Sequence, residues 1–475
     1  MKPADLMRST ALALALACAC GAAQAGATIT IINANNPGVG FNDPTPVAPI
    51  GGNPGTTLGQ QRLNAFTHAA NIWGATINSP IEIRIRAAFV PMFCTANSAV
   101  LGAAGTADIF AEFANSPRPE SWYPSALASK IAGEDLPGAG SPHIVANFNS
   151  RLGLFADCLP GSPYYLGLDA NHGTSVDLVA VLLHEMAHGL GFQTFTNGQS
   201  GNRIEGRPSV WDHYLTDSRT GKNWAAMDNA ERQSSAVSGN ALVWSGTYVN
   251  AAASTVLAPM PNLAISGSAA GDASGNYLVG EATFGPPLSS SGVTGQLMPV
   301  VDQGNGTGLA CAPLSAANAR AVKGNVALVD RGTCTFVIKA KHVQDAGGIG
   351  MVVADNAPGD VLALGGTDPS ITIPAVRVSQ ADGVRLKARL ASRSRTQSGV
   401  VASLGVDPGR LAGMGSNGMV MMYSPVEYQP GSSVSHFSTD GRPNLLMEPS
   451  INGDLSHQLS APRDLTLELM KDIGW

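Results

Sequence analysis

The sequence predicts a mixed α/β (α+β) fold in which one domain is interrupted by the insertion of another. In the first half, strand-like runs alternate with segments at helical spacing, which is an α/β order. Near residue 257 the composition shifts toward Val, Ala and Gly, and near residue 410 it shifts again. We therefore expect a first domain over residues 26–256, an inserted α/β domain over 257–405, and a return to the first domain over 406–475.

Length and composition agree with this organisation. A chain of 475 residues is long enough for two or three domains, and 44% hydrophobic with 13% charged residues suits a globular protein with a sizeable core. The 55 glycines and 31 prolines have no collagen-like period, so they indicate many turns. A net charge of −6 gives no reason to expect nucleic acid or an anionic membrane surface as a partner.

The N-terminus is typical of an export signal. Lys2 and Arg8 form a positive region, Thr10 to Cys20 is a short apolar run, and an A-x-A motif places cleavage near Ala25-Gly26. The apolar run is too short to span a membrane, and no later run reaches that length. We expect residues 1–25 to be removed and the product to be secreted or periplasmic.

The cysteines predict two disulfides. Cys18 and Cys20 fall in the signal and raise a lipoprotein alternative, although neither sits in a good lipobox. An even number remains in an exported chain, which favours disulfide pairing. Three pairings are possible, and the one that keeps each bond inside one proposed domain is Cys94–Cys158 with Cys311–Cys334.

Each domain has recognisable elements. In the first, the expected elements are a strand over 28–32, a helix over 57–74, strands over 81–86 and 144–148, and a helix capped by Asp177 that runs to about Gly189. In the insert they are strands over 326–329, 350–354 and 373–378 and a helix over 337–346. The last segment carries a strand candidate over 419–423, ordered loops over 428–460, and a helix over 465–472 capped by Asp464.

The stretch LLHEMAHGLGFQTF, residues 182–195, indicates a zinc site. On a helix His184 and His188 lie on the same face and can bind one metal, and Glu185 can hold a water beside it. Zinc lowers the pKa of such a water to about 7, so that a carboxylate can take its proton. The helix is otherwise apolar, where an unpartnered His or Glu would be costly.

Two histidines leave the ligand set incomplete, because a catalytic zinc usually has three protein ligands and one open position. The compact form of this motif has its third ligand six residues after the second histidine, where this chain has Thr194, a poor ligand. The other nominees are Asp212 and His213 in SVWDHYL, His457, and His436 in GSSVSHFSTDGRPNLLMEP.

The chain resembles the metzincin metalloproteases, and within them the leishmanolysin-like branch. Residues 184–192 match that family's His-Glu-x-x-His-x-x-Gly-Phe helix, Ser435-His436-Phe437 its late third histidine, and residues 446–449 its Met-turn. The resemblance implies that His436 is the third ligand and that Met447 forms an apolar floor beneath the metal. Asp212 or His213 remains the alternative third ligand.

The insert resembles the protease-associated domain. The matching residues are Cys311, Pro313-Leu314, Lys323-Gly324, residues 326–329, Arg331-Gly332, Cys334, Phe336, Lys339 and Ala346-Gly347. This resemblance implies a Cys311–Cys334 disulfide and a non-catalytic role as a lid or in recruiting substrate.

Together these features predict an exported zinc endopeptidase with one catalytic zinc ion, acting on proteins or peptides, with Glu185 as general base and then acid. The substrate would pair as a strand with a sheet edge, for which Ile144 to Phe148 is the candidate. The alternatives are an exported binding or adhesion protein with a structural or inactive zinc site, and zinc hydrolysis of a non-peptide substrate. No calcium loop is recognisable, so calcium is left unassigned.

Overall fold

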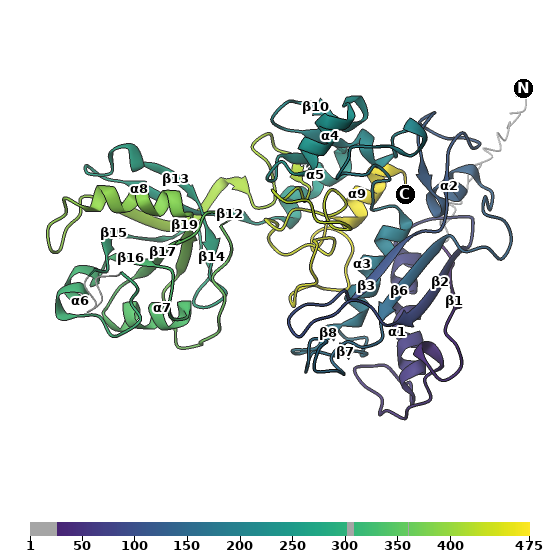
Figure 1. The fold of residues 1–475 in the computed structure, drawn as a ribbon, viewed down its shortest axis with the longest axis horizontal. Helices are drawn as coiled ribbons and strands as arrows, with labels where there is room; N and C mark the ends of the chain where they lie inside the picture. Colours follow the sequence, from purple (N-terminus) through teal and green to yellow (C-terminus); the bar gives the residue numbers. More distant parts are fainter. Residues whose placement is uncertain (1–25, 302–307, 360) are drawn as a thin grey trace, which may run out of the picture.

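The computed structural model describes residues 26–301, 308–359 and 361–475. The predicted export signal, with Cys18 and Cys20, lies outside the described residues. Within the described part of the chain, no helix is long and apolar enough to cross a membrane. The chain forms two bodies joined by a pair of strands (Figure 1).

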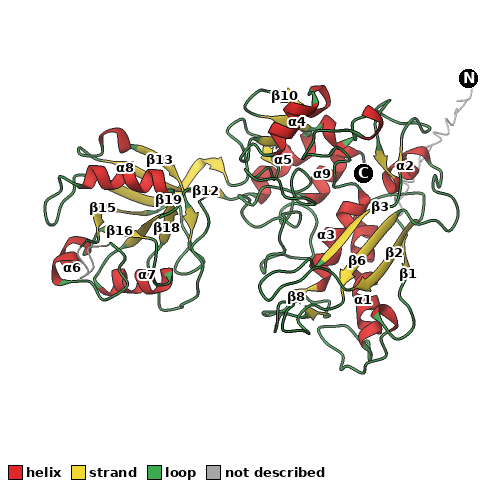
Figure 2. Ribbon diagram, in the orientation of Figure 1, coloured by secondary structure: helices red, strands yellow, loops and turns green. Residues whose placement is uncertain are grey.

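The first body is built on a four-stranded sheet with helices packed against it (Figure 2). Its order is β1-β2-β6-β3, with the first three strands parallel and β3 antiparallel to β6. The elements are β1 (Ile29–Asn33), β2 (Ile83–Val90), β3 (Gly102–Thr106), β6 (Ile144–Asn149), α1 (Leu58–Thr76) and α3 (Leu178–Leu190). Every predicted element of this part is therefore present, and Trp73 of α1 donates from Nε1 to the Leu183 carbonyl at 3.1 Å, which fixes α1 against α3.

The prediction that residues 144–148 form the free edge was wrong. These residues form β6, which has β2 on one side and β3 on the other. The edge next to β6 is β3, whose sequence GAAGT has no aromatic residue and only one β-branched residue, Thr106, so it carries little of the signal of a strand. At Gly102 the packing favours glycine, because a Cβ there would lie 3.0 Å from Cγ of Glu185 on α3.

Helix α3 is buried on every side, which explains its apolar sequence. Asp177 caps it as predicted and accepts the Val179 N–H at 2.9 Å. The helix ends at Gly191, whose φ of +126° favours glycine. A polar side chain on this helix must therefore find a partner inside the protein.

The segments before and after the insert form one body. β11 (Leu242–Trp244) pairs with β20 (Val420–Met421), and α5 (Thr247–Val256) packs against α9 (Thr466–Ile473). The predicted capping residue Asp464 does accept the Thr466 N–H at 2.7 Å, but its other oxygen accepts the Leu446 N–H at 2.7 Å. Asp464 thus ties the last helix to the loop that contains Met447.

The remaining elements of the first body are short. They are α2 (Ser125–Ala132), α4 (Asn229–Ala236), β4 (Ile109–Phe110), β5 (Tyr123–Pro124), β7 (Tyr164–Tyr165), β8 (Val176–Asp177), β9 (Leu215–Asp217) and β10 (Lys222–Asn223). The long stretch over residues 428–460 is loop, as expected. Cys94 and Cys158 form the predicted disulfide.

The second body is an eight-stranded sheet of order β13-β12-β19-β15-β16-β17-β18-β14. Its strands are β12 (Pro259–Ser266), β13 (Gly275–Leu278), β14 (Gly280–Glu281), β15 (Val293–Pro299), β16 (Val326–Asp330), β17 (Gly350–Ala354), β18 (Ala375–Val378) and β19 (Val401–Leu411), and its helices are α6 (Ala316–Val322), α7 (Phe336–Asp345) and α8 (Gln380–Leu390). Cys311 and Cys334 form the other disulfide. The paired strands β12 and β19 connect the bodies, with Pro259 opposite Leu411.

We expect the first body to fold without the second. Its hydrophobic core contains no residue between 258 and 410, and the ends of the excised segment are already neighbours. Replacing residues 260–410 by a short Gly-Ser linker removes the buried Glu281 together with its site and leaves only its partner, the partly exposed Arg442, so no unpaired buried charge results. Thermal unfolding followed by circular dichroism should therefore show one cooperative transition.

The matched control is a chain that ends at residue 256, which lacks β20 and α9 and should unfold without cooperativity. Loss of cooperative unfolding in the excised chain would contradict independence of the two bodies.

Candidate metal centre

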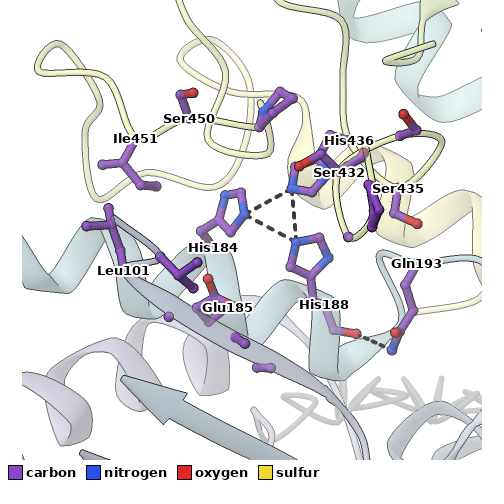
Figure 3. A pocket seen from close by; sticks show the side chains of 18 of the residues that line it. Leu101, His184, Glu185, His188, Gln193, Ser432, Ser435, His436, Ser450 and Ile451 are labelled. Carbon is purple, nitrogen blue, oxygen red and sulfur yellow. Dashed lines mark hydrogen bonds between the residues drawn. The ribbon is translucent and has the colours of Figure 1, made fainter. Parts of the chain in front are cut away.

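Three buried histidines converge at one point in the first body. His184 and His188 project from successive turns of α3, and His436 comes from the loop between β20 and α9 (Figure 3). Each pair of Nε2 atoms is separated by 3.2 Å. The side chains are 4–8% exposed. The structure therefore brings the two motif histidines together with His436, 248 residues beyond His188.

Backbone carbonyls hold the other ring nitrogen of each histidine. His184 Nδ1 lies 2.7 Å from the Leu446 carbonyl, His188 Nδ1 2.7 Å from that of Phe192, and His436 Nδ1 2.8 Å from that of Ser432. A carbonyl can only accept, so each Nδ1 carries the hydrogen and each Nε2 presents a lone pair to the centre. Partners of this kind fix the tautomer and orientation of metal-binding histidines.

The donor set fits zinc. Zinc–nitrogen bonds of about 2.0–2.1 Å in a tetrahedron place neighbouring nitrogens about 3.3 Å apart, close to the observed 3.2 Å. Burial lowers the pKa of His184 to about 4 and that of His188 to about 3, and the pKa of His436 falls well below its usual value. All three rings are then neutral at pH 7, which is the form that binds metal. Among the described residues this is the one cluster of three possible ligands.

Glu185 lies beside the cluster without joining it. Its carboxyl is 7% exposed and lines the same cleft as the histidines. Burial raises the pKa of Glu185 to about 8, partly offset by the backbone N–H of Ala104 on β3. A nearby dication would favour the charged carboxylate. The residue thus has the position and the environment of a group that exchanges protons.

The loop around Met447 supports the ligand set. Met447 is fully buried, and its carbonyl accepts the Phe437 N–H at 2.8 Å. The carbonyl of Leu446 holds His184, so this turn contacts both a helix ligand and the residue next to His436. It therefore links the two parts of the site.

The other nominees have different partners. His213 Nε2 lies 2.9 Å from Ser121 Oγ, and His457 Nε2 lies 2.8 Å from Asp177 Oδ2, where it supports the cap of α3. Asp212 is fully buried and accepts hydrogen bonds from hydroxyl groups, including that of Thr194. None of these four side chains is part of the histidine cluster.

A cleft of about 890 Å³ contains the histidines and Glu185. One wall is formed by residues 97–104, which include the start of β3, and the facing wall by residues 428–436 and 449–451. Of these two walls the sequence pointed only to residues of the His436 and Met-turn motifs, because neither wall has a regular period that would indicate its position. Apart from Glu185, the described residues that line the cleft include no Asp, Glu, Lys or Arg.

Comparison with known proteins identifies the insert. Residues 293–386 match the PA domain family. The resemblance of this segment to the protease-associated domain is therefore confirmed, while the match leaves the first body unassigned.

Several relatives that share part of the chain are peptidases. The minor extracellular protease Vpr of Bacillus subtilis is 34% identical over 115 residues, 23% of this chain and 14% of that protein. Leucine aminopeptidase 2 of Arthroderma otae is 41% identical over 71 residues, 15% of this chain and 14% of that protein. A membrane and RING domain protein of Oryza sativa, 36% identical over 108 residues, spans 22% of this chain and 19% of its own. This chain thus spans less than a fifth of the length of these relatives.

Solved structures give only a weak likeness. A zinc aminopeptidase from Bacillus subtilis, BSAP, aligns with a TM-score of 0.23 at 20% identity, over 34% of this chain and 36% of that one. A likeness at this level does not define the fold of the first body.

The ligand set predicts how two histidine substitutions will differ. His436→Ala removes one of three converging nitrogens and should lower zinc affinity by more than the about 10–100-fold lost when an outer-shell partner is changed. His213→Ala removes only the contact with Ser121 and should leave one zinc per chain. Metal content by mass spectrometry after dialysis measures both. Zinc loss in the His213 variant alone would reverse the ligand assignment.

The buried carboxyl of Glu448, next to Met447, should make the free energy of unfolding depend on pH. The carboxyl is 1% exposed, and burial, with Asp454, Asp464 and Asp440 nearby, raises the pKa of Glu448 from 4.5 to about 8. Between these values the folded chain retains a proton that the unfolded chain has lost, so stability falls as pH rises. Glu448→Gln should remove this dependence, on the order of 2–4 kcal/mol between pH 5 and pH 8.

Urea unfolding at both pH values provides the measurement. The exposed residue Glu427 supplies the matched control, because Glu427→Gln makes the same chemical change outside the core. Parallel pH profiles for the wild type and the Glu448 variant would show that the carboxyl has no such role.

Proposed function

We propose that the chain is an exported zinc-dependent endopeptidase of the metzincin, leishmanolysin-like type, with an inserted PA domain. The observation that carries the proposal is the convergence of three neutral histidine Nε2 atoms beside Glu185 in one open cleft. The helix motif of residues 184–192, the late histidine and the Met-turn supply the family assignment, with Met447 as the apolar floor of the site. Partial relatives that are peptidases and carry a similar segment agree with it.

The chain's own residues would perform the proton transfers. His184, His188 and His436 would hold zinc, which when bound supplies a Lewis acid for the substrate carbonyl and acidifies a water. The Glu185 carboxylate would take the proton of the attacking water and then deliver it to the nitrogen of the leaving amine. Burial alone raises the pKa of Glu185, and zinc bound beside it would favour the ionised carboxylate that the first of these transfers needs.

The edge strand β3 offers a place for an extended substrate. β3 is the last strand of its sheet, and residues 102–104 line the cleft beside Glu185. An extended peptide can add to such an edge through backbone hydrogen bonds. The small side chains of Gly102 and Ala103 leave room for this approach.

The lining of the cleft favours cleavage within a chain over removal of terminal residues. A free α-ammonium group needs a carboxylate to pair with, and a free α-carboxylate needs a cation. Apart from Glu185, the described lining residues carry neither. A substrate whose chain continues through the cleft in both directions presents no terminal charge.

The insert would not take part in the chemistry. Glu281 pairs with Arg442 of the first body, and the other buried charged side chains have partners within the insert: Asp355 bonds Arg331 at 2.8 Å and also contacts Arg377, while Lys339 Nζ donates to the Leu309 carbonyl at 2.6 Å. The contacts within the insert stabilise the domain itself. We assign it a role in covering the cleft or recruiting substrate.

Substitution of Glu185 tests the proposal. Glu185→Gln keeps the size of the side chain and all three histidines but removes the base, so casein cleavage should fall about 10²–10⁴-fold while zinc content stays unchanged. A peptide blocked at both ends should be cleaved by the wild type as well as the free peptide is.

Three results would point elsewhere. Unchanged casein cleavage in the Glu185 variant would refute the enzyme assignment for this site. Zinc binding without any peptide or ester cleavage by the wild type would favour the binding or adhesion protein. Cleavage of free but not blocked peptides would indicate an aminopeptidase.

A further inference from the structure

The segment that follows α3, residues 192–196, contacts both parts of the metal centre. The Phe192 carbonyl accepts from His188 Nδ1, and Gln193 Nε2 donates to the His188 carbonyl at 2.7 Å (Figure 3). On the other side, the Thr194 N–H donates to Ser435 Oγ at 3.2 Å. Ser435 immediately precedes His436. This segment therefore spans the gap between a helix ligand and the loop of the distant ligand.

The Thr194 hydroxyl is fully used in fixing that segment. It donates to Asp212 Oδ1 at 2.7 Å and accepts the Thr196 N–H at 3.0 Å. Thr194 occupies the sequence position of the third ligand in the compact motif. In this chain its side chain faces Asp212 and its backbone faces Ser435.

Asp212 is an anion whose hydrogen-bonding capacity is saturated by neutral donors. Oδ1 accepts from Thr194 Oγ1 and from Ser209 Oγ at 2.8 Å, and Oδ2 accepts from Thr196 Oγ1 and from Ser209 N at 3.1 Å. A carboxylate has about four acceptor positions, so none is left for a metal. At 0% exposure the carboxylate depends on these donors, with additional electrostatic interaction from Arg203 and Arg232.

The surrounding aromatic rings hold the two sides of this network together. Trp211, next to Asp212, packs on Phe192 with ring centroids 4.8 Å apart. Phe192 in turn packs on Phe437, next to His436, at 5.1 Å. The polar contacts and the rings follow the same route, from the segment around Asp212 to the loop of the distant ligand.

We propose that Asp212 and Thr194 are positioning residues for the third ligand. Asp212 fixes Thr194, the Thr194 N–H holds Ser435, and Ser435 fixes His436 at 3.2 Å from the two helix histidines. The inference rests on the proposed function, because it assumes that these histidines bind zinc. The network supplies the rigidity that the chain loses by taking its third ligand from a distant loop.

Zinc dissociation tests this role. Thr194→Val removes the hydroxyl at nearly constant volume, and Ser435→Ala removes the acceptor at the other end. Each should speed transfer of zinc to a chelator by about 10–100-fold, the usual cost of an outer-shell change. Thr194→Ser keeps the hydroxyl and should restore a rate close to the wild type. In the double variant the increase in release rate should be smaller than the product of the two single increases, since both substitutions interrupt the same chain of contacts.

A matched control and a stability measurement separate positioning from folding. Thr294 in the inserted domain forms a comparable hydroxyl pair with Ser403 at 2.8 Å, and Thr294→Val should release zinc at the wild-type rate. The metal-free form of Ser435→Ala should unfold within a few degrees of the metal-free wild type, whereas metal-free Thr194→Val should be less stable because it removes a donor from the buried Asp212. In both variants the zinc-loaded form should lose more thermal stability, relative to the zinc-loaded wild type, than the metal-free form loses.

Wild-type zinc release from both Thr194→Val and Ser435→Ala would overturn the inference. So would equal losses of stability with and without zinc, because they indicate a purely structural contact. A wild-type chain that binds no zinc would refute the proposed function and this inference together, whereas the first two results leave the proposed function intact.

Discussion

The first body depends on one constraint: three neutral imidazoles must present their Nε2 lone pairs to the same point. Such an arrangement is unfavourable unless the other nitrogen of each ring is hydrogen-bonded. Here each Nδ1 donates to a backbone carbonyl. The carbonyls are those of Leu446 in the turn before Met447, of Phe192 just after α3, and of Ser432 in the loop that leads to His436. The tautomer of each ligand is thus set by a different piece of chain, and the site exists only when all three pieces are docked.

The burial of α3 determines what its neighbours must supply. A buried helix that carries two histidines and a carboxyl needs partners for these polar groups inside the protein. Trp73 of α1 donates to the backbone of α3 on one side, and Gly102 of β3 allows close approach on the other. The edge strand therefore serves both as the support of Glu185 and as the wall of the cleft.

The sequence allowed prediction of the features that depend on local pattern. The apolar run with its Asp177 cap predicted α3, and alternation predicted β2 at residues 81–86. The even cysteine count with the domain division predicted both disulfides. Strand β3 was not predicted because its small residues reflect its packing against α3. That packing is a contact between segments that are distant in the sequence. The edge was assigned to residues 144–148 for the same reason: a strand's own sequence does not show what lies on either side of it.

Asp212 in SVWDHYL is an example of a polar residue near a motif whose role cannot be assigned from sequence alone. An aspartate close to two zinc-binding histidines has the chemistry of a ligand, and the same carboxylate can equally accept hydroxyl donors. The choice depends on which donors the fold brings to it, and Asp212 receives those of Thr194, Thr196 and Ser209. With its acceptor positions filled, it cannot also bind a cation. A hydroxyl at position 194 therefore fits this arrangement, since a histidine there would remove a donor from the buried carboxylate of Asp212.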